Sequence, residues 1–198
     1  SDNQEMFTLD ELTKAFNISG ISKSPSIFDY DKLEWFNGEY IRKMSPEEFT
    51  SYAMPYYKEA VTSRELPWDK LCGILQQRVT KFTQIPEMID FFDKLPEYDA
   101  EMFVNKKSKT NLENAPVMLK AVTDKLTALE SWDKDSIHDC LINLAQELEV
   151  KNGTVMWPAR IAAAGKKVTP GGAVEILEIL GRDEALARLN LGLEKLGV

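Results

Sequence analysis

The sequence predicts an all-α protein made of two packed helical subdomains. Apolar residues recur at helical spacing along almost the whole chain, and no stretch alternates strictly enough to indicate a strand. Proline or serine stands at the start of several of these runs, where helices commonly begin. With 198 residues, of which 43% are hydrophobic, the chain is long enough to bury a core.

The first half of the chain carries a start signal before each expected helix. Thr8 and Glu11 form a capping-box pattern. Ser45 is placed as a helix cap, with Pro46 at the first helical position and glutamates after it. The other expected starts are Asp29 or Asp31, before an apolar run that ends at Ile41; Pro67, before Leu71, Ile74, Leu75, Val79 and Phe82; and Pro86, before Met88, Ile89, Phe92 and Leu95.

Five further helices are expected in the second half, at 112–129, 136–148, 154–164, 173–180 and 183–196. Gly165 and Gly181 fit the C-terminal glycines of two of them. Helical periodicity breaks between Leu95 and Thr110, where Pro96, an acidic stretch and the run NKKSKT follow one another. We therefore divide the chain into a first unit at 1–103 and a second at 104–198.

Composition narrows the classes of function. A net charge of -8 argues against broad, non-specific nucleic-acid binding but leaves room for a local basic face. No apolar run reaches the roughly 20 residues of a membrane span, and the opening residues SDNQEMFTLDEL do not resemble a secretory signal. Cys72 and Cys140 lie far apart without metal-ligand spacing, so free thiols in a reducing cytoplasm are expected.

Three short motifs are rejected as catalytic. Lys43-Met44-Ser45 resembles the start of a nucleotide-binding loop, but Pro46 and Glu47 follow where cations would be needed. Gly165-Lys166-Lys167 lacks the first glycine and the hydroxyl residue of a phosphate loop. His138 is the only histidine, and its neighbours on a helix would not face it, so it is interpreted as a partly exposed helix residue. We expect neither a catalytic residue nor a metal site.

Two segments remain as candidate binding sites. Lys151, Arg160, Lys166 and Lys167 are four basic residues in a stretch without an acidic one, and a Thr169–Gly172 turn follows. In an acidic chain, such a stretch is typical of contact with an anion such as RNA, although a solvated loop explains it too. The second segment is Gln76-Gln77-Arg78, for which a solvated helix end is the alternative. Trp157 is interpreted as structural.

Three segments in the same order resemble the C-terminal anticodon-binding region of bacterial-type glutamyl-tRNA synthetases, which are class I enzymes. The first is FDYDKLEWFNGEYIR (28–42), similar to the helix that joins the family's stem-contact region to its anticodon-binding bundle. The second is LQQRVTKFTQIPEMIDFF (75–92), and the third is WPARIAAAGKKVTPGGAVEILEILGRDEALARL (157–189). Together they span most of the chain.

The resemblance implies roles for individual residues. Arg78 matches an arginine that faces the third anticodon base, and Arg160 matches a helix arginine before the turn. Thr169 and Pro170 match the turn that meets the first two bases, with Gly171 shaping it, whereas Gly172 departs from the bulkier apolar residue expected there. Lys166 and Lys167 become candidate phosphate contacts, and Arg78 implies a preference for glutamate tRNA.

The resemblance also implies the setting of the chain. It would be the C-terminal part of a cytoplasmic, monomeric glutamate–tRNA ligase, with no cofactor of its own. ATP and Mg2+ would serve the parent enzyme, whose catalytic domain would precede residue 1, and the tRNA(Glu) anticodon loop would be the partner, with no membrane involved. A helical protein-interaction module and a stand-alone RNA-binding paralogue are the alternatives. An apolar groove between the two units would favour the former.

Overall fold

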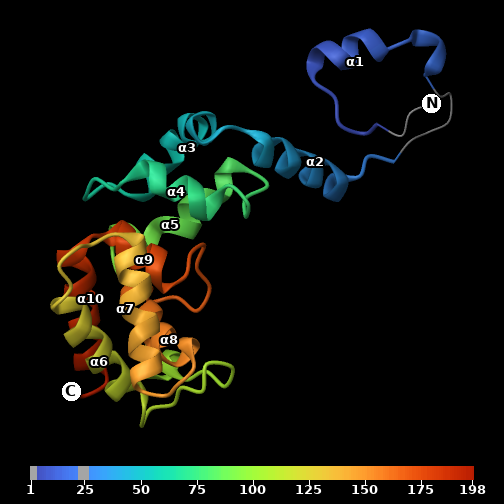
Figure 1. Ribbon diagram of the computed structural model, residues 1–198. Coiled ribbons are helices and arrows are strands. Elements are labelled where there is room, and N and C mark those ends of the chain that lie inside the picture. The colour runs from blue at the N-terminus through green and yellow to red at the C-terminus, as the bar shows by residue number, and fades with distance from the viewer. Residues whose placement is uncertain (1–3, 22–26) are drawn as a thin grey trace.

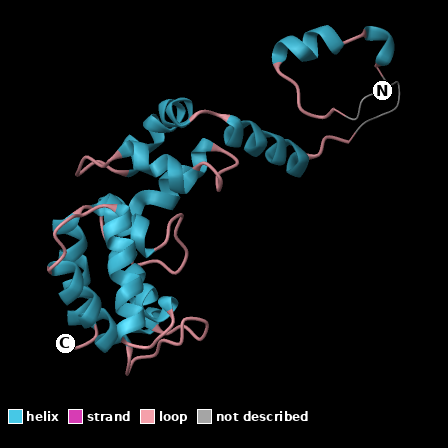
Figure 2. Cartoon of the chain, in the orientation of Figure 1, coloured by secondary structure: helices cyan, strands magenta, loops and turns pink. Residues whose placement is uncertain are grey.

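The computed structural model describes residues 4–21 and 27–198, and every regular element within them is a helix (Figures 1 and 2). The α-helices are α1 (Leu9–Ala15), α2 (Tyr30–Lys43), α3 (Pro46–Ala60), α4 (Trp68–Leu75), α5 (Ile85–Asp93), α6 (Ala115–Thr127), α7 (Lys134–Glu147), α8 (Asn152–Ala164), α9 (Ala173–Leu180) and α10 (Arg182–Lys195). Three short 3-10 helices are η1 (Ile18–Gly20), η2 (Phe82–Gln84) and η3 (Ala100–Phe103). The predicted all-α class is confirmed. Residues 1–3 and 22–26, which belong to the predicted first unit, lie outside the described part.

The predicted helix starts are formed by the residues expected. Thr8 and Glu11 form the capping box of α1, with the Thr8 amide donating to Glu11 Oε2 at 2.7 Å. Ser45 Oγ accepts from the Glu48 amide at 3.1 Å at the start of α3. Of the two aspartates considered for α2, Asp29 is the cap, since its carboxylate accepts from the Lys32 amide at 3.0 Å. These caps involve residues three apart, so local sequence determines them.

The helix expected after Pro67 is shorter than the apolar spacing predicts. α4 ends at Leu75, so Val79 and Phe82 lie beyond it, although Val79 is buried. Gln76, the residue just after α4, donates through its side chain to the carbonyl oxygens of Ile41 and Met44 at 3.0 and 2.8 Å. The Arg78 amide then donates to Leu75 O, three residues earlier, at 2.8 Å, which is the hydrogen bond of a 3-10 turn. Tertiary hydrogen bonds thus override the helical pattern, and Arg78 lies in a turn.

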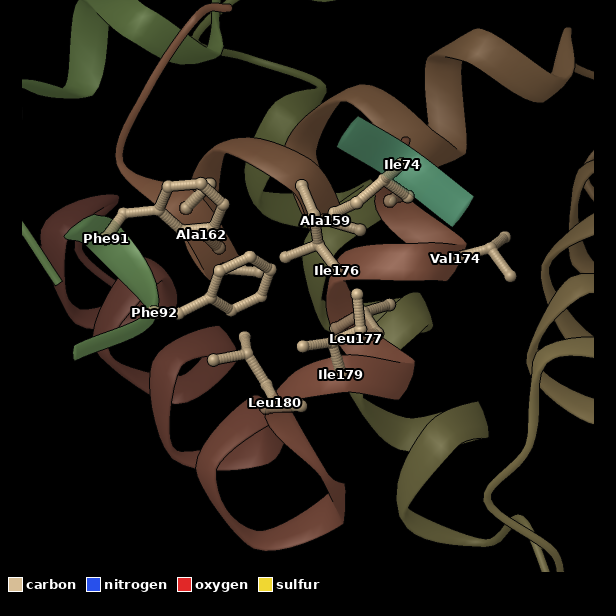
Figure 3. Close-up of a cluster of buried hydrophobic side chains, with 14 of the residues drawn as sticks. Ile74, Phe91, Phe92, Ala159, Ala162, Val174, Ile176, Leu177, Ile179 and Leu180 are labelled. Atoms are coloured by element: carbon tan, nitrogen blue, oxygen red, sulfur yellow. The ribbon is translucent and has the colours of Figure 1, made fainter. Parts of the chain in front are cut away.

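The helices form two groups. α3, α4 and α5 pack together with η2, and α6 to α10 pack into the larger bundle, while α2 leads away from them towards α1 (Figure 1). One hydrophobic cluster runs through both groups: Figure 3 shows Phe91 and Phe92 of α5 beside Ala162 of α8 and Leu180 of α9. The boundary between 103 and 104 stays a prediction, and η3 just before it contacts α8.

A buried arginine joins the two groups. Arg188 of α10 is only 1% exposed, and its guanidinium donates to the carbonyl oxygens of Phe91 at 2.7 Å, Ala163 at 2.9 Å and Phe92 at 3.3 Å. It also donates to Glu184 at 2.6 Å. These carbonyls lie in the last turns of α5 and α8, where helices leave acceptors unpaired and favour a cation. Arg188 therefore fixes the end of α5 against the larger bundle.

Candidate nucleic-acid interface

The turn between α8 and α9 begins at a position that requires glycine. Gly165 has φ of 62°, in the left-handed region, and ends α8 as the sequence predicts. A Cβ atom there would lie 2.9 Å from Pro96 Cγ. The start of the turn is therefore held against the segment that follows α5.

The rest of the turn is fixed by its own hydrogen bonds and by contact with α4. Thr169 Oγ1 donates to Gly171 O at 2.7 Å, and the Gly172 amide donates to Glu175 Oε2 at 3.1 Å at the start of α9. Pro170 and Gly171 are buried. A Cβ on Gly171 would lie 3.2 Å from Ile74 Cγ2, so the backbone of the turn packs closely on α4.

This packing places Arg78 beside the turn. Arg78 is exposed, and two clefts meet at Arg78 and Pro170. One cleft, of about 370 Å³, is lined by Arg78, Glu87, Met88, Lys166, Val168, Thr169 and Pro170. The other, of about 520 Å³, is lined by Lys70, Gly73, Ile74, Gln77, Arg78, Lys134, Pro170, Gly171, Gly172, Glu175, Glu178 and Ile179. The two segments singled out from the sequence thus meet across the boundary between the helix groups.

The larger cleft is charged. Lys70 pairs with Glu178 at 2.6 Å, and Lys134 pairs with Glu175 at 3.1 Å. Burial raises the pKa of Glu175, but its hydrogen bonds and the Lys134 charge outweigh that effect, so the net pKa is lowered. Charged and apolar side chains thus both line the space between the two groups.

Arg160 of α8 also contacts the turn. Its Nη2 donates to Lys167 O at 3.0 Å, and its guanidinium carbon lies 4.6 Å from the centre of the Trp157 ring. Burial lowers the pKa of Arg160, and its Nε is buried without a partner within residues 4–21 and 27–198. A smaller cleft joins Arg160 to Gly172, which also lines the larger cleft. Trp157 donates to Met102 O at 3.1 Å, in keeping with a structural role.

The two lysines of the turn differ in environment. Lys166 forms an ion pair with Asp90 and donates to Glu87 O at 3.0 Å, so it ties the turn to α5. Lys167 is exposed and forms no ion pair with the described residues. The sequence offered no means of separating these neighbours. Of these two lysines, only Lys167 has no ion-pair partner among residues 4–21 and 27–198.

The other groups considered from the sequence are the possible metal ligands, the two thiols and the histidine. Over the described ranges, no group of histidine, cysteine and acidic side chains could hold a metal ion. Cys72 and Cys140 are free thiols, as predicted, and burial raises the pKa of each. His138 is exposed on α7 beside Asp139, in agreement with its interpretation from the sequence. None of the described helices is long and apolar enough to span a membrane.

A family model described as "Anticodon binding domain" matches residues 38–193, which include α3 to α9, most of α10 and every candidate site residue. This match defines the class: the chain belongs to the anticodon-binding domain family.

The particular relatives are glutamate–tRNA ligases. The chain is 48% identical over 195 residues to the ligase of Clostridium kluyveri and 49% identical over 197 residues to that of Clostridium novyi. Each match covers 98% of this chain and 40% of the relative, so the chain spans less than half of their length. The crystal structure of a glutamate tRNA ligase from Elizabethkingia meningosepticum, solved in complex with its amino acid, superposes with a TM-score of 0.84 at 25% identity, covering 98% of this chain and 38% of that one.

Proposed function

We propose that this chain is the C-terminal, anticodon-binding part of a glutamate–tRNA ligase. The observation that carries the proposal is the meeting of exposed Arg78 with the rigid turn at Pro170, at the junction of two clefts. RNA loops are recognised as unstacked bases held against side chains and backbone, and a rigid turn beside an exposed arginine offers both kinds of contact.

Arg78 is proposed to read the third anticodon base. A glutamate anticodon ends in C, whose pairing edge offers the acceptors O2 and N3 to the donor-only guanidinium. A glutamine anticodon ends in G, whose pairing edge presents donors at N1 and N2, so an arginine there meets repulsion as well as lost bonds. The same position therefore favours glutamate tRNA and rejects glutamine tRNA.

The turn is proposed to receive the first two bases. Thr169, Pro170 and Gly171 would meet them, and the internal bond from Thr169 Oγ1 to Gly171 O supports this by holding the turn in one shape. Arg160 supports the turn through its bond to Lys167 O and lines the smaller cleft. Lys167 is proposed as the phosphate contact, and Lys166 as the residue that positions the turn through Asp90.

The parent enzyme is proposed to use ATP and Mg2+ in a catalytic domain that precedes this chain, as a monomer in the cytoplasm. The chain itself would then supply recognition without catalysis. Two measurements test this assignment. The purified chain is expected to show no glutamate-dependent ATP–pyrophosphate exchange, and the reading frame upstream of Ser1 is expected to encode a class I catalytic domain. Exchange activity by the chain alone would contradict the proposal.

The Arg78→Gln variant tests the recognition itself. A glutamine amide has a donor and an acceptor, so it meets the acceptors of C less well and the donors of G better. A bidentate arginine–base contact discriminates by about 1–3 kcal/mol, so the parent enzyme is expected to lose roughly five- to hundred-fold of its preference for C over G. The ratio of kcat/KM for the two anticodons measures it. Lys58→Gln, at an exposed position of α3 that lines none of the three clefts, is the control. An unchanged ratio in Arg78→Gln would remove Arg78 from the site.

A further inference from the structure

A lysine-rich hairpin lies beside the cleft that contains Arg160. Asn105 and Thr110 pair through two backbone hydrogen bonds of 3.0 Å, and Ser108 N donates to Asn105 Oδ1 at 3.0 Å. Buried Thr110 donates through Oγ1 to Phe103 O at 2.7 Å. The backbone of residues 105–110 is therefore well fixed, while Lys106, Lys107 and Lys109 are exposed on it.

The hairpin is attached to the start of α8. Thr154 Oγ1 donates to Ser108 O at 2.7 Å, and a Cβ on Gly153 would lie 3.4 Å from Ser108 Oγ. Lys151, also exposed, is the residue just before α8. Four lysines thus gather at one end of α8, and we refer to Lys106, Lys107, Lys109 and Lys151 as the hairpin cluster.

The hairpin cluster continues the candidate interface. Ser108 and Gly153 line the same cleft as Arg160 and Gly172. Gly172 in turn lines the larger cleft, which reaches Arg78. In Figure 1 the yellow-green segment that carries the hairpin and the orange turn before α9 project on the same side of the bundle. A path of adjoining clefts therefore leads from Arg78 past the turn to the hairpin.

The charges of the hairpin cluster are not neutralised by the protein. Within the described part of the chain, none of its four lysines forms an ion pair, whereas Lys70, Lys134 and Lys166 around the neighbouring clefts do. Like charges held close together on a fixed backbone repel one another. In a chain of net charge -8, such a cluster is suited to contact with an anionic partner.

The backbone at Lys109 gives an independent reason to assign a role to its side chain. Lys109 has φ of 55°, in the left-handed region where asparagine and glycine are far more favourable than lysine. Asn114 Nδ2 donates to Lys109 O at 2.9 Å and helps to hold this conformation. A lysine at a position that disfavours it, next to two other lysines, supports a function of its charge.

We propose that the hairpin cluster binds the sugar–phosphate backbone of the tRNA whose anticodon bases lie against Arg78 and the turn. This inference rests on the function proposed above and extends the interface beyond Arg160. Because phosphate contacts are independent of base identity, the cluster should add affinity and salt dependence without changing anticodon preference.

The salt dependence of tRNA binding tests the proposal. The chain is titrated with a glutamate tRNA transcript at several salt concentrations, and the double variant Lys106→Ala, Lys107→Ala is compared with it. The slope of log K against log salt is expected to fall by about 0.7–0.9 for each lost contact. The ratio between C-ending and G-ending anticodons is expected to stay the same. The control is Lys58→Ala, Lys94→Ala, which removes the same charge from exposed positions that line none of the clefts.

The Lys109→Asn variant separates binding from folding. Asparagine suits the left-handed backbone, so the melting temperature is expected to rise or stay level. The slope of log K against log salt is expected to fall by about 0.7–0.9, the value for one lost phosphate contact. A variant that is at least as stable as the original chain and binds tRNA with an unchanged slope would overturn the role of the hairpin. Failure of the unmodified chain to bind glutamate tRNA would instead overturn the proposed function together with this inference.

Discussion

Arginine and lysine side chains serve opposite purposes in two regions of this molecule. In the joint between the helix groups, Arg188 is buried and Arg64 pairs with Glu184 at 3.0 Å, which is also the partner of Arg188. At the candidate interface, Arg78 and Lys167 are exposed and form no ion pair with any described residue. Arg188 and Arg64 hold the two groups together through buried or paired guanidinium groups, whereas Arg78 lines both clefts between the groups without an ion-pair partner among the described residues. Whether an arginine has a partner within the protein therefore distinguishes a structural role from a candidate ligand contact better than the residue type does.

The strongest test of the joint is Arg188→Met. The methionine would leave the carbonyl oxygens of Phe91, Phe92 and Ala163 without their buried donor. Removing one partner of a buried, hydrogen-bonded charge costs roughly 3 kcal/mol or more, and the free energy of unfolding from denaturant titration measures it. Lys195→Met is the control, because Lys195 pairs with a fully exposed Glu97 and a pair of that kind contributes at most about 1 kcal/mol. Equal losses in the two variants would mean that Arg188 does not anchor the joint.

A smaller loss is expected from Gly192→Ala, which tests the packing that supports the interface. A Cβ on Gly192 of α10 would lie 2.7 Å from Ala162 Cβ and 3.0 Å from Leu119 Cδ2, so α8 and the Leu119 side chain of α6 would have to shift. Overpacking of this kind costs about 1–3 kcal/mol. Gly73→Ala in α4, where a Cβ meets nothing within 4 Å, is expected to gain about 0.5–1 kcal/mol instead. Thermal unfolding of both variants decides whether close helix contact explains Gly192.

The smallest effects distinguish the two neighbouring lysines. Lys166→Ala removes the ion pair with Asp90 and is expected to cost at most about 1 kcal/mol of stability. Lys167→Ala is expected to leave stability unchanged and to reduce the salt slope of tRNA binding by about 0.7–0.9. Unfolding and salt titrations of both single variants are needed. If Lys166→Ala alone changed the slope, the assignment of the two lysines would have to be reversed.

The fold could be predicted from the sequence wherever local interactions determine it. The caps at Thr8 and Ser45 and the left-handed Gly165 involve residues close in sequence, and the structure confirms all three. The end of α4 could not be predicted, because Gln76 bonds to carbonyls more than 30 residues away. Apolar spacing at Val79 and Phe82 indicates burial, and burial alone does not distinguish a helix from a turn.

The role of the candidate site stays a prediction, but the positions of some of its residues can be compared with the sequence. Arg78, Thr169 and Pro170 come together at one cleft, which the resemblance to a known family implied and spacing alone could not. Arg188 was not singled out, because an arginine four residues after Glu184 on a charged helix has the pattern of a solvated ion pair. Its burial depends on α5 and α8, which are distant in sequence. The lysines of the hairpin were interpreted only as a break in periodicity.

The side chain of Gln76 has a mechanical consequence. It donates to Ile41 O and Met44 O at the end of α2, and Arg78 follows two residues later in the same turn. The segment that carries Arg78 is therefore also hydrogen-bonded to the end of α2, the helix that leads away from both groups (Figure 1). The same segment also contacts α2 through Thr80, whose carbonyl oxygen accepts from Asn37, so a displacement of that turn would break several bonds unless α2 moved with it.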